Sequence, residues 1–427
     1  MERYHKYKDS GVQWLGEIPE HWKAIPVRRI AQVNPSKKKD LSSDDYVGYA
    51  PMERIRCDQM VPTKIKVSQL TSGLTYCEQG DIVLAKVTPC FENGNLAIVP
   101  KVENGCCYAS SELFVFRPKN NVLDRFLFYT FLNRSFIDAG ASTMRGTGGL
   151  KRVTTEFANS AATPLPPLSE QHSIVSYLDD KCGKIDKMLE GKQKQIELLA
   201  EMKQRIIADA VTRGLNPDAK MKETNIAWLP EIPEHWTVKP IRAILRENNE
   251  KTETGTEELL SLSQYTGVSR KRDAGKTGMF EAESTIGYKK VHSGQFVMNI
   301  MLAWNGSYAV SGLDGIISPA YCVFDFISND NKMYYNYLWR LGVYQGAFKT
   351  ESRGIIDSRL RLYPNKFLPF PTICPPLEEQ NAIVNYINEK VVKIDTLTSK
   401  LQQEIESIKE YKQRLISDVV TGQIKVC

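Results

Sequence analysis

The chain has 427 residues, 42% of them hydrophobic and 25% charged, which is enough apolar material for two full hydrophobic cores. Its net charge of +6 suits a polyanionic partner without requiring one. The nine scattered cysteines lack paired C-x-x-C motifs, and neither a signal peptide nor a membrane-length apolar run is visible, so we expect a reduced, cytoplasmic, soluble protein without a zinc site or disulfide framework.

The first clear motif of the chain occurs twice. The segment 14–22 reads Trp-Leu-Gly-Glu-Ile-Pro-Glu-His-Trp and returns at 228–236 as Trp-Leu-Pro-Glu-Ile-Pro-Glu-His-Trp. In both copies a histidine precedes a tryptophan. We interpret His21 and His235 as packing or capping residues and the tryptophans as anchors, although the pattern also admits a catalytic reading.

Residues 23–165 and 237–374 form the interiors of the two halves. Both are rich in short β-branched and aromatic runs separated by glycine, such as 80–87 and 111–116 in the first half and 294–298 and 318–324 in the second. These runs predict curled, mostly antiparallel sheet with one or two helices. The two interiors agree poorly apart from such landmarks, so the fold is predicted to be copied and the surface to differ.

Each half closes with a long helical segment. Pro-Pro-Leu-Ser-Glu-Gln at 166–171 and Pro-Pro-Leu-Glu-Glu-Gln at 375–380 mark the starts, because proline disfavours helix before it. Apolar residues then recur at heptad spacing, which predicts a coiled-coil seam. The seam residues are Leu178, Ile185, Leu189, Ile196, Leu199 and Ile206 in the first segment and Ile387, Ile394, Leu401, Ile405, Ile408 and Leu415 in the second.

The two helical segments are expected to pair with each other in antiparallel fashion, which gives the chain an internal pseudo-two-fold axis. The end of the second copy should then lie beside the start of the chain, in a circular organisation. Lys192, Lys203 and Lys412 stand at core positions of the seam. They either fix the register of the helices or extend along the helix surface to reach water.

Basic and polar residues gather in the loops of both interiors at matching landmarks such as Arg145-Gly146 and Arg353-Gly354. One such cluster is usually a solvated face, but its repetition favours phosphate contact and base reading. The candidate DNA-binding residues of the first half are Lys37, Lys38, Lys39, Arg54, Arg56, Lys86, Arg145, Thr147, Lys151 and Arg152. Those of the second half are Arg270, Lys271, Arg272, Lys276, Lys289, Lys290, Asn305, Arg353, Arg359 and Arg361.

The predicted fold class is therefore α+β, with two β-rich recognition domains separated by a long antiparallel two-helix coiled coil and related by an internal repeat. The expected boundaries are 1–165 for the first recognition domain, 166–215 for the first long helix, 216–374 for the second recognition domain and 375–427 for the second long helix.

The chain closely resembles the specificity subunit of type I restriction-modification systems. The resemblance rests on the motif at 14–22 and its copy at 228–236, the helix starts, and the Lys-Ile-Asp and Lys-Gln-Arg landmarks at 184–186, 393–395, 203–205 and 412–414. It implies two target recognition domains that each read half of a bipartite DNA sequence. It also implies docking of two methyltransferase subunits, and through them of restriction subunits.

The resemblance further implies a chain without catalytic, metal or cofactor residues, with S-adenosylmethionine, ATP and Mg²⁺ used by partner subunits only. In agreement, the sequence has no phosphate-binding glycine loop and no adenine-methyltransferase motif. One alternative is a non-catalytic coiled-coil assembly protein whose end domains bind protein. The other is an independent enzyme, which would have to methylate or cleave DNA on its own.

Overall fold

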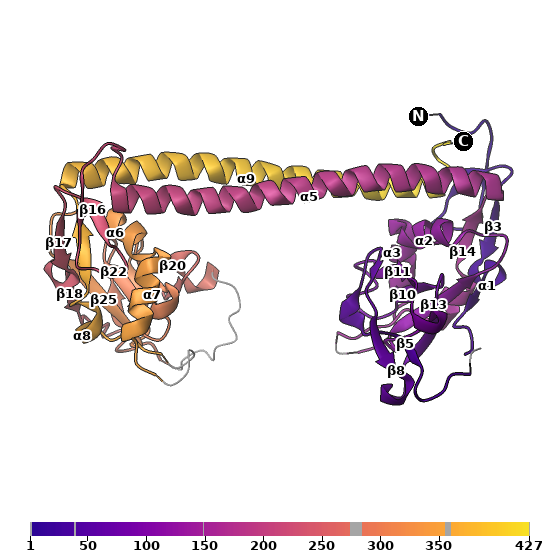
Figure 1. Cartoon of the computed structure of the whole chain (residues 1–427), viewed down its shortest axis with the longest axis horizontal. Helices are drawn as coiled ribbons and strands as arrows, with labels where there is room; N and C mark the ends of the chain where they lie inside the picture. Colours follow the sequence, from indigo (N-terminus) through magenta and orange to yellow (C-terminus); the bar gives the residue numbers. More distant parts are fainter. Residues whose placement is uncertain (1, 38–39, 148, 274–283, 355–359, 427) are drawn as a thin grey trace. The chain divides into compact units, whose positions relative to one another are not determined.

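The computed structural model describes residues 2–37, 40–147, 149–273, 284–354 and 360–426. The chain divides into two compact units (Figure 1). The first unit comprises residues 1–194 and 401–427, and the second comprises residues 195–400. The two long helices, α5 (Leu168–Arg213) and α9 (Leu377–Val420), each contribute a segment to both units.

The first unit contains two four-stranded sheets. The first has the order β11-β10-β13-β4 and the second has the order β8-β5-β12-β9, in which β5 and β12 are parallel. The strands are β4 (Ala31–Val33), β10 (Ile82–Ala85), β11 (Leu96–Ile98) and β13 (Leu113–Pro118), then β5 (Tyr46–Ala50), β8 (Thr63–Lys66), β9 (Thr75–Glu78) and β12 (Cys106–Ala109). Among the described residues, the shorter α-helices that accompany them are α1 (Val27–Ile30), α2 (Asp124–Leu132), α3 (Arg134–Ser142) and α4 (Thr155–Ser160).

Three two-stranded sheets complete the first unit. They are β1 (Tyr7–Asp9) with β2 (Glu17–Pro19), β3 (Lys23–Pro26) with β14 (Ala162–Leu165), and β6 (Ile55–Arg56) with β7 (Gln59–Met60). All four residues of β10 are buried, as expected for a strand inside a sheet that is covered on both faces.

The second unit repeats the first of these sheets as β18-β25-β22-β23. Its strands are β18 (Leu245–Asn248), β22 (Phe296–Asn299), β23 (Tyr308–Val310) and β25 (Tyr321–Phe326). The pairs are β15 (Met221–Glu223) with β16 (Glu231–Pro233), β17 (Thr237–Pro240) with β26 (Pro371–Cys374), β19 (Leu260–Ser263) with β20 (Gly267–Arg270), and β21 (Lys289–Val291) with β24 (Gly315–Ile317). The helices are α6 (Lys332–Trp339), α7 (Gly342–Glu351) and α8 (Pro364–Phe367).

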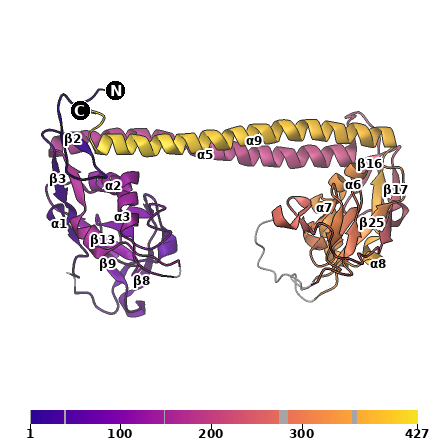
Figure 2. The same cartoon turned by 180° about the vertical axis from the view of Figure 1, so that it is seen from behind.

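Within each unit, segments of α5 and α9 lie side by side and run in opposite directions (Figures 1 and 2). The core of the first unit includes Leu178 of α5 and Leu415 of α9 together with domain residues such as Phe126. In the second unit, Val211 and Ile387 join domain residues such as Tyr334 in the same way. Each recognition domain therefore shares one hydrophobic core with the helix segments of its unit.

The seam residues predicted from the sequence are all buried or half-buried. Among them Leu178 and Ile387 are fully buried, while Ile185, Leu189, Ile196, Leu199, Ile206 and Ile408 are intermediate.

The two ends of the described chain meet in the first unit. The Lys425 amide donates to the Glu2 carbonyl at 2.9 Å, and the Tyr7 hydroxyl donates to the Gly422 carbonyl at 2.8 Å. The corresponding junction in the second unit is made by continuous chain through Gly214. The expected circular organisation is present.

The predicted fold class, β-rich domains with an antiparallel helix pair and an internal repeat, is confirmed. None of the helices in the described ranges has the length and apolar character needed to cross a membrane.

Candidate nucleic-acid interface

The repeated tryptophan motif holds each recognition domain against the start of a long helix. His21 Nε2 lies 2.7 Å from Glu170 Oε1, and the indole N–H of Trp22 donates to Glu170 Oε2 at 2.9 Å. His235 and Trp236 make the same two hydrogen bonds to Glu379, at 2.8 and 3.0 Å. Both tryptophans are fully buried, so the predicted anchoring role agrees with their contacts.

In the first unit, the neighbours of Glu170 change the pKa of its carboxyl group. Burial on its own raises the pKa of Glu170, but hydrogen bonds from Trp22, His21 and Tyr4 lower it below its ordinary value. The Tyr4 hydroxyl donates to Glu170 Oε2 at 2.9 Å. Glu170 therefore remains ionised and accepts hydrogen bonds from three side chains. These bonds attach the recognition domain to the start of α5.

The glutamine that follows this glutamate in each helix-start motif connects the helix to the domain. The Leu123 amide donates to Gln171 Oε1 at 2.9 Å, and the Gln171 amide group donates to the Pro166 carbonyl at 2.9 Å. Gln380 repeats this with the Asn331 amide, at 2.8 Å, and the Pro375 carbonyl, at 2.9 Å. The side-chain amide is buried in both copies, and it fixes the entry to the helix that follows the main sheet, α2 or α6.

Lysines at seam positions pair with acids on the opposite helix. In the first unit, Lys412 contacts Asp186 at 2.6 Å, and in the second unit Lys203 contacts Asp395 at 2.7 Å. A further pair in the first unit joins Lys192 to Glu404 at 2.5 Å. Because these contacts are between helices, they favour one register, which is the first of the two roles considered for these lysines.

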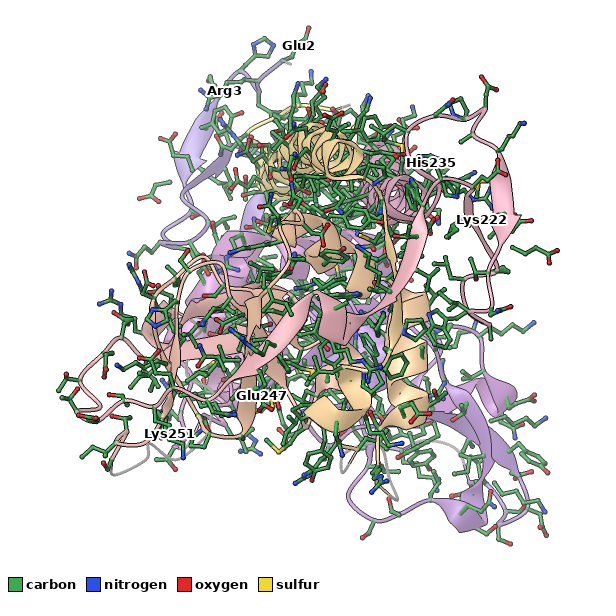
Figure 3. All side chains as sticks on the ribbon, turned by 90° about the vertical axis from the view of Figure 1, so that its left-hand side faces the viewer. Glu2, Arg3, Lys222, His235, Glu247 and Lys251 are labelled. Carbon is green, nitrogen blue, oxygen red and sulfur yellow. The ribbon has the colours of Figure 1, made fainter. Side chains whose placement is uncertain are left out.

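Figure 3 views the second unit along its helix segments. His235 lies beside the helix ends, whereas Glu247 and Lys251 lie at the opposite side of the recognition domain. Lys222 of β15 bonds to the backbone carbonyls of Glu234, at 2.5 Å, and Trp236, at 2.6 Å, and so ties the β15–β16 pair to the anchor.

Two loops closed by paired arginines occupy corresponding positions in the two domains. Arg145 and Arg152 exchange backbone hydrogen bonds at 3.0 and 2.9 Å, and Arg353 and Arg361 do the same at 3.0 and 2.9 Å. The residue after each second arginine donates to the backbone beyond β10 or β22, from Val153 to Lys86 and from Leu362 to Ile300. In both units a pair of arginines is thus held at the end of a buried central strand.

The structure brings together four of the candidates in the first unit: Lys86, Arg145, Lys151 and Arg152. The guanidinium of Arg152 is held by Glu112 through hydrogen bonds of 2.8 and 2.7 Å, and these bonds lower the pKa of Glu112. Thr147 is exposed in the same loop. Lys37, Arg54 and Arg56 are exposed on other segments, and Lys38 and Lys39 lie outside the described residues.

The candidates of the second unit are more scattered. Arg353 and Arg361 share the arginine-closed loop, Asn305 lies exposed in the short η6 helix (Ala303–Asn305), and Arg270, Lys271 and Arg272 follow one another at the end of β20. Lys276 and Arg359 lie outside the described residues.

Three of the second-unit candidates already have acidic partners. Lys289 is buried and lies 3.7 Å from Glu247, while Lys290 lies 3.0 Å from Glu250. Arg272 is 3.4 Å from Glu258. Phosphate contact by these residues would compete with existing ion pairs, which the sequence pattern could not show.

One turn of each domain lies close to the helices, and its chemistry differs between the units. In the first unit, the turn between β6 and β7 carries Asp58, which accepts two hydrogen bonds from Arg125, at 2.5 and 2.7 Å. Arg125 also donates to Asp179 of α5 at 2.8 Å, and Asp179 accepts from Tyr129 at 2.7 Å. Burial alone lowers the pKa of Arg125, but the two carboxylates raise it, so this charge is firmly held.

The second unit keeps only part of this arrangement. Tyr337 donates to Asn388 of α9 at 2.7 Å, as Tyr129 does to Asp179. At the position of Arg125 stands Met333, which borders an open cleft of about 550 Å³. The cleft is bounded by Lys203 on α5, by the β19–β20 turn and by Arg340. Neither Arg340 nor the turn residue Tyr265 stands out in the sequence, because the exposure of one and the hydrogen bonds of the other depend on packing.

The chain is similar to specificity subunits of type I restriction systems. Residues 19–198 match the family described as type I restriction modification DNA specificity domain. These similarities agree with the prediction from the sequence, because the matched family and the relatives are type I specificity proteins.

Among individual proteins, the chain is 34% identical over 195 residues to the type I restriction enzyme EcoAI specificity subunit of Escherichia coli, which covers 43% of this chain and 33% of that protein. The matched segment spans about a third of the length of this relative and of the EcoEI specificity subunit. The MjaVIII specificity subunit of Methanocaldococcus jannaschii is 25% identical over 438 residues, covering 96% of this chain and 94% of that protein.

Two solved structures share the fold at low sequence identity. A chain from a study of complex assembly and conformational transition of the type I R-M system has a TM-score of 0.70 at 17% identity, covering 95% of this chain and 99% of its own. The HsdS subunit from Thermoanaerobacter tengcongensis has a TM-score of 0.52 at 18% identity, covering 95% and 98%.

Proposed function

We propose that this chain is the sequence-specific DNA-binding subunit of a type I restriction-modification complex and is itself non-catalytic. Each recognition domain reads one half of a bipartite double-stranded DNA target. The observation that carries the proposal is a repeated frame, the His-Glu-Trp anchors and Lys-Asp pairs, that supports two domains with different loops. A protein that must recognise two unlike half-sites needs this combination.

The proposed domains are residues 1–165 and 216–374 for recognition and residues 166–215 and 375–427 for the helices. Two methyltransferase subunits dock on this chain, and restriction subunits join through them. The chain needs no cofactor of its own; S-adenosylmethionine, ATP and Mg²⁺ act on the partner subunits, and the complex works in the cytoplasm, where its DNA is.

The basic loops support DNA as the ligand. The arginine-closed loops at Arg145–Arg152 and Arg353–Arg361 occur at equivalent ends of the central strands. Arginine and lysine side chains on loops held by rigid sheet can contact phosphates, while neighbouring polar groups read base edges. Affinity for DNA should therefore fall steeply with salt, whereas an apolar protein-binding surface would respond little.

The test is to map the DNA sequences methylated by the chain assembled with its methyltransferase partner. Two short specified sequences separated by an unspecified gap are expected, and one continuous specified sequence contradicts the proposal.

Two changes to the chain test whether the domains and the helices act independently. Exchanging residues 23–165 for the corresponding segment of another specificity subunit should replace one of the two specified sequences and leave the other unchanged. Inserting about one heptad near residues 190–195 should widen the gap without changing either specified sequence; a change in both specified sequences would show that the helix is not an independent spacer.

A further inference from the structure

The β19–β20 pair of the second unit is a short antiparallel ribbon with an exposed aromatic tip. Its strands pair from Leu260 opposite Arg270 to Ser263 opposite Gly267. Tyr265, in the connecting turn, is 83% exposed, the highest value among the large apolar side chains of the described ranges. A tyrosine presents an apolar ring and a polar hydroxyl, so at this exposed position it is available for contact with a partner.

The ribbon has one apolar face and one polar face. Leu260 and Leu262 are buried in a cluster with Val297 and Val323 of the main sheet. On the other face, Ser261 stands opposite Ser269, and both are half-buried. The major groove of B-DNA admits a two-stranded ribbon, and serines on the outer face let its backbone approach the groove closely.

Basic residues continue from the ribbon. β20 ends at Arg270, and η5 (Lys271–Asp273) follows directly. The Lys271 amide donates to the Leu259 carbonyl at 2.8 Å and so extends the strand pairing by one step. Positive charge beside a groove-sized ribbon suits the phosphates that flank a groove.

The exposed tip is held by a side chain from outside the ribbon. Arg340, at the end of α6, donates to the Gln264 carbonyl through Nη2 and to the Tyr308 carbonyl through Nη1 at 3.3 Å. The Tyr265 amide donates to Ser263 Oγ at 3.1 Å. Gly267 has a φ of +71°, and a Cβ there would lie 3.1 Å from Ala309 Cβ, so the turn requires glycine. The tip is therefore preorganised.

The equivalent region of the first unit explains why the partner should be DNA. There the turn carries Asp58 and is held against Arg125 and Asp179 by charge pairs, and a carboxylate at the tip would repel phosphate. The two units must read different half-sites, so a reading element that is present in one unit and replaced in the other fits DNA. Identical protein partners would favour a feature repeated in both units.

We propose that the β19–β20 ribbon enters the major groove of the half-site read by the second unit, with Gln264, Tyr265 and Thr266 contacting base edges. Arg340 acts as a positioning residue that fixes the tip. Glutamine pairs with adenine through two hydrogen bonds and an apolar ring packs on the thymine methyl group, so the ribbon should read an A·T-containing step. This proposal rests on the function proposed above.

The experiment uses the full chain assembled with its methyltransferase partner and a duplex that carries its mapped target. Every base pair of both half-sites is substituted in turn, and binding is measured by fluorescence anisotropy. The variants are Gln264→Ala, Tyr265→Ala and Arg340→Met. The matched control is Val238→Ala, which truncates an exposed apolar residue of the same unit on β17.

Gln264→Ala and Tyr265→Ala should each weaken binding to the target about ten-fold and relax discrimination at A·T pairs of one half-site only. The salt dependence should not change, because neither substitution removes a phosphate contact. Arg340→Met should give the same relaxed base profile although Tyr265 is still present. Retained discrimination at the remaining base pairs of the same half-site shows that the second unit is folded in these variants, and Val238→Ala should bind like the unaltered chain.

Three results would overturn the ribbon proposal. The variants could bind with unaltered affinity and profile, they could lose affinity equally for unrelated DNA, or they could lose the methyltransferase subunit in size-exclusion chromatography, which would make the ribbon a protein-docking surface. If the unaltered complex shows no base preference at all, the proposed function itself fails, and this outcome is distinguishable from the other three.

Discussion

The two units use the same contacts to hold a recognition domain on the helices and different contacts on the turn that lies nearest to them. Glu170 and Glu379 gather the same histidine and tryptophan donors. The turn is bound to Arg125 in the first unit, whereas in the second it borders a cleft and carries an exposed tyrosine. Attachment is therefore constrained by the repeated helices, while the domain surface is free to diverge.

The largest effect is expected at the anchors. Truncation of a fully buried tryptophan removes many contacts and leaves a cavity, so Trp22→Ala should lower the free energy of unfolding of the first unit by about 3–5 kcal/mol. Because Trp236 is equally buried and makes the same hydrogen bond, Trp236→Ala should cost the second unit as much. Chemical denaturation followed by hydrogen exchange, which resolves the two units, measures both.

Unequal losses would break the comparison. If Trp22→Ala destabilised the first unit and Trp236→Ala left the second unchanged, the repeated motif would have kept its sequence without its role.

A second prediction converts one turn into the other. Arg125→Met places in the first unit the residue found at the equivalent position of the second, Met333. Loss of the charged hydrogen bonds to Asp58 and Asp179 should cost about 2 kcal/mol and speed amide exchange in the β6–β7 turn. The reverse change, Met333→Arg, alters a 38% exposed side chain and should stay within about 0.5 kcal/mol.

Unchanged exchange at residues 55–60 in Arg125→Met would show that packing alone holds this turn. The contrast between the two units would then have to come from the length of the turns instead of the ion pairs.

The helix pair and the attachment of the two domains could be predicted from the sequence because their motifs occur twice. Two copies of the tryptophan motif and two heptad patterns at equivalent distances leave few alternatives for the helix pair. The acid partner of the histidines was not predicted, since His21 and Glu170 are 149 residues apart. Both belong to repeated motifs, and that shared repetition was a usable signal.

The candidate DNA-binding surface could be predicted only in outline. The clustering of basic residues predicted Lys289 and Lys290 as DNA-binding residues, but in the folded chain they pair with Glu247 and Glu250. The clustering of basic residues could not indicate Tyr265. Exposure is a property of packing, and a tyrosine in a glycine-containing turn is equally compatible with a buried position. The arginine-closed loops were found because Arg-Gly occurs at matching places in both halves.

The lysine–aspartate ion pairs between α5 and α9 should contribute little to stability, and by equal amounts in the two units. Double-mutant cycles on Lys203–Asp395 and Lys412–Asp186 should each give about 0.2–1 kcal/mol, because the aspartates are more than half exposed. The control is the Lys184–Asp180 pair, which lies on one helix and cannot set the register between helices. Screening by salt should reduce all three coupling energies.

Register is the sharper readout for these pairs. Disulfide trapping between cysteines introduced on α5 and α9 should find one alignment in the unaltered chain and additional alignments in a chain with both Lys203→Met and Lys412→Met. One alignment in that double variant would show that the apolar seam alone sets the register.

The smallest expected effect is the pH dependence of the first anchor. The pKa of Glu170 is lowered in the folded state from its ordinary value of 4.5, so the folded chain binds fewer protons there than the unfolded chain. The resulting stability is fully present above pH 4.5 and is lost as the pH falls through the lower, folded pKa. Relative to the unaltered chain, Glu170→Gln should be destabilised above pH 4.5, and the difference should shrink in acid.

A second variant tests the hydrogen bonds that lower this pKa. Tyr4→Phe removes one of the three donors, so the pKa of Glu170 should rise part of the way towards its ordinary value. The stability that this variant loses in acid should therefore be smaller than the loss in the unaltered chain. Unfolding midpoints measured between pH 3 and pH 6 decide this, and a constant difference between the Glu170→Gln and unaltered chains would mean that the carboxylate charge does not hold the anchor.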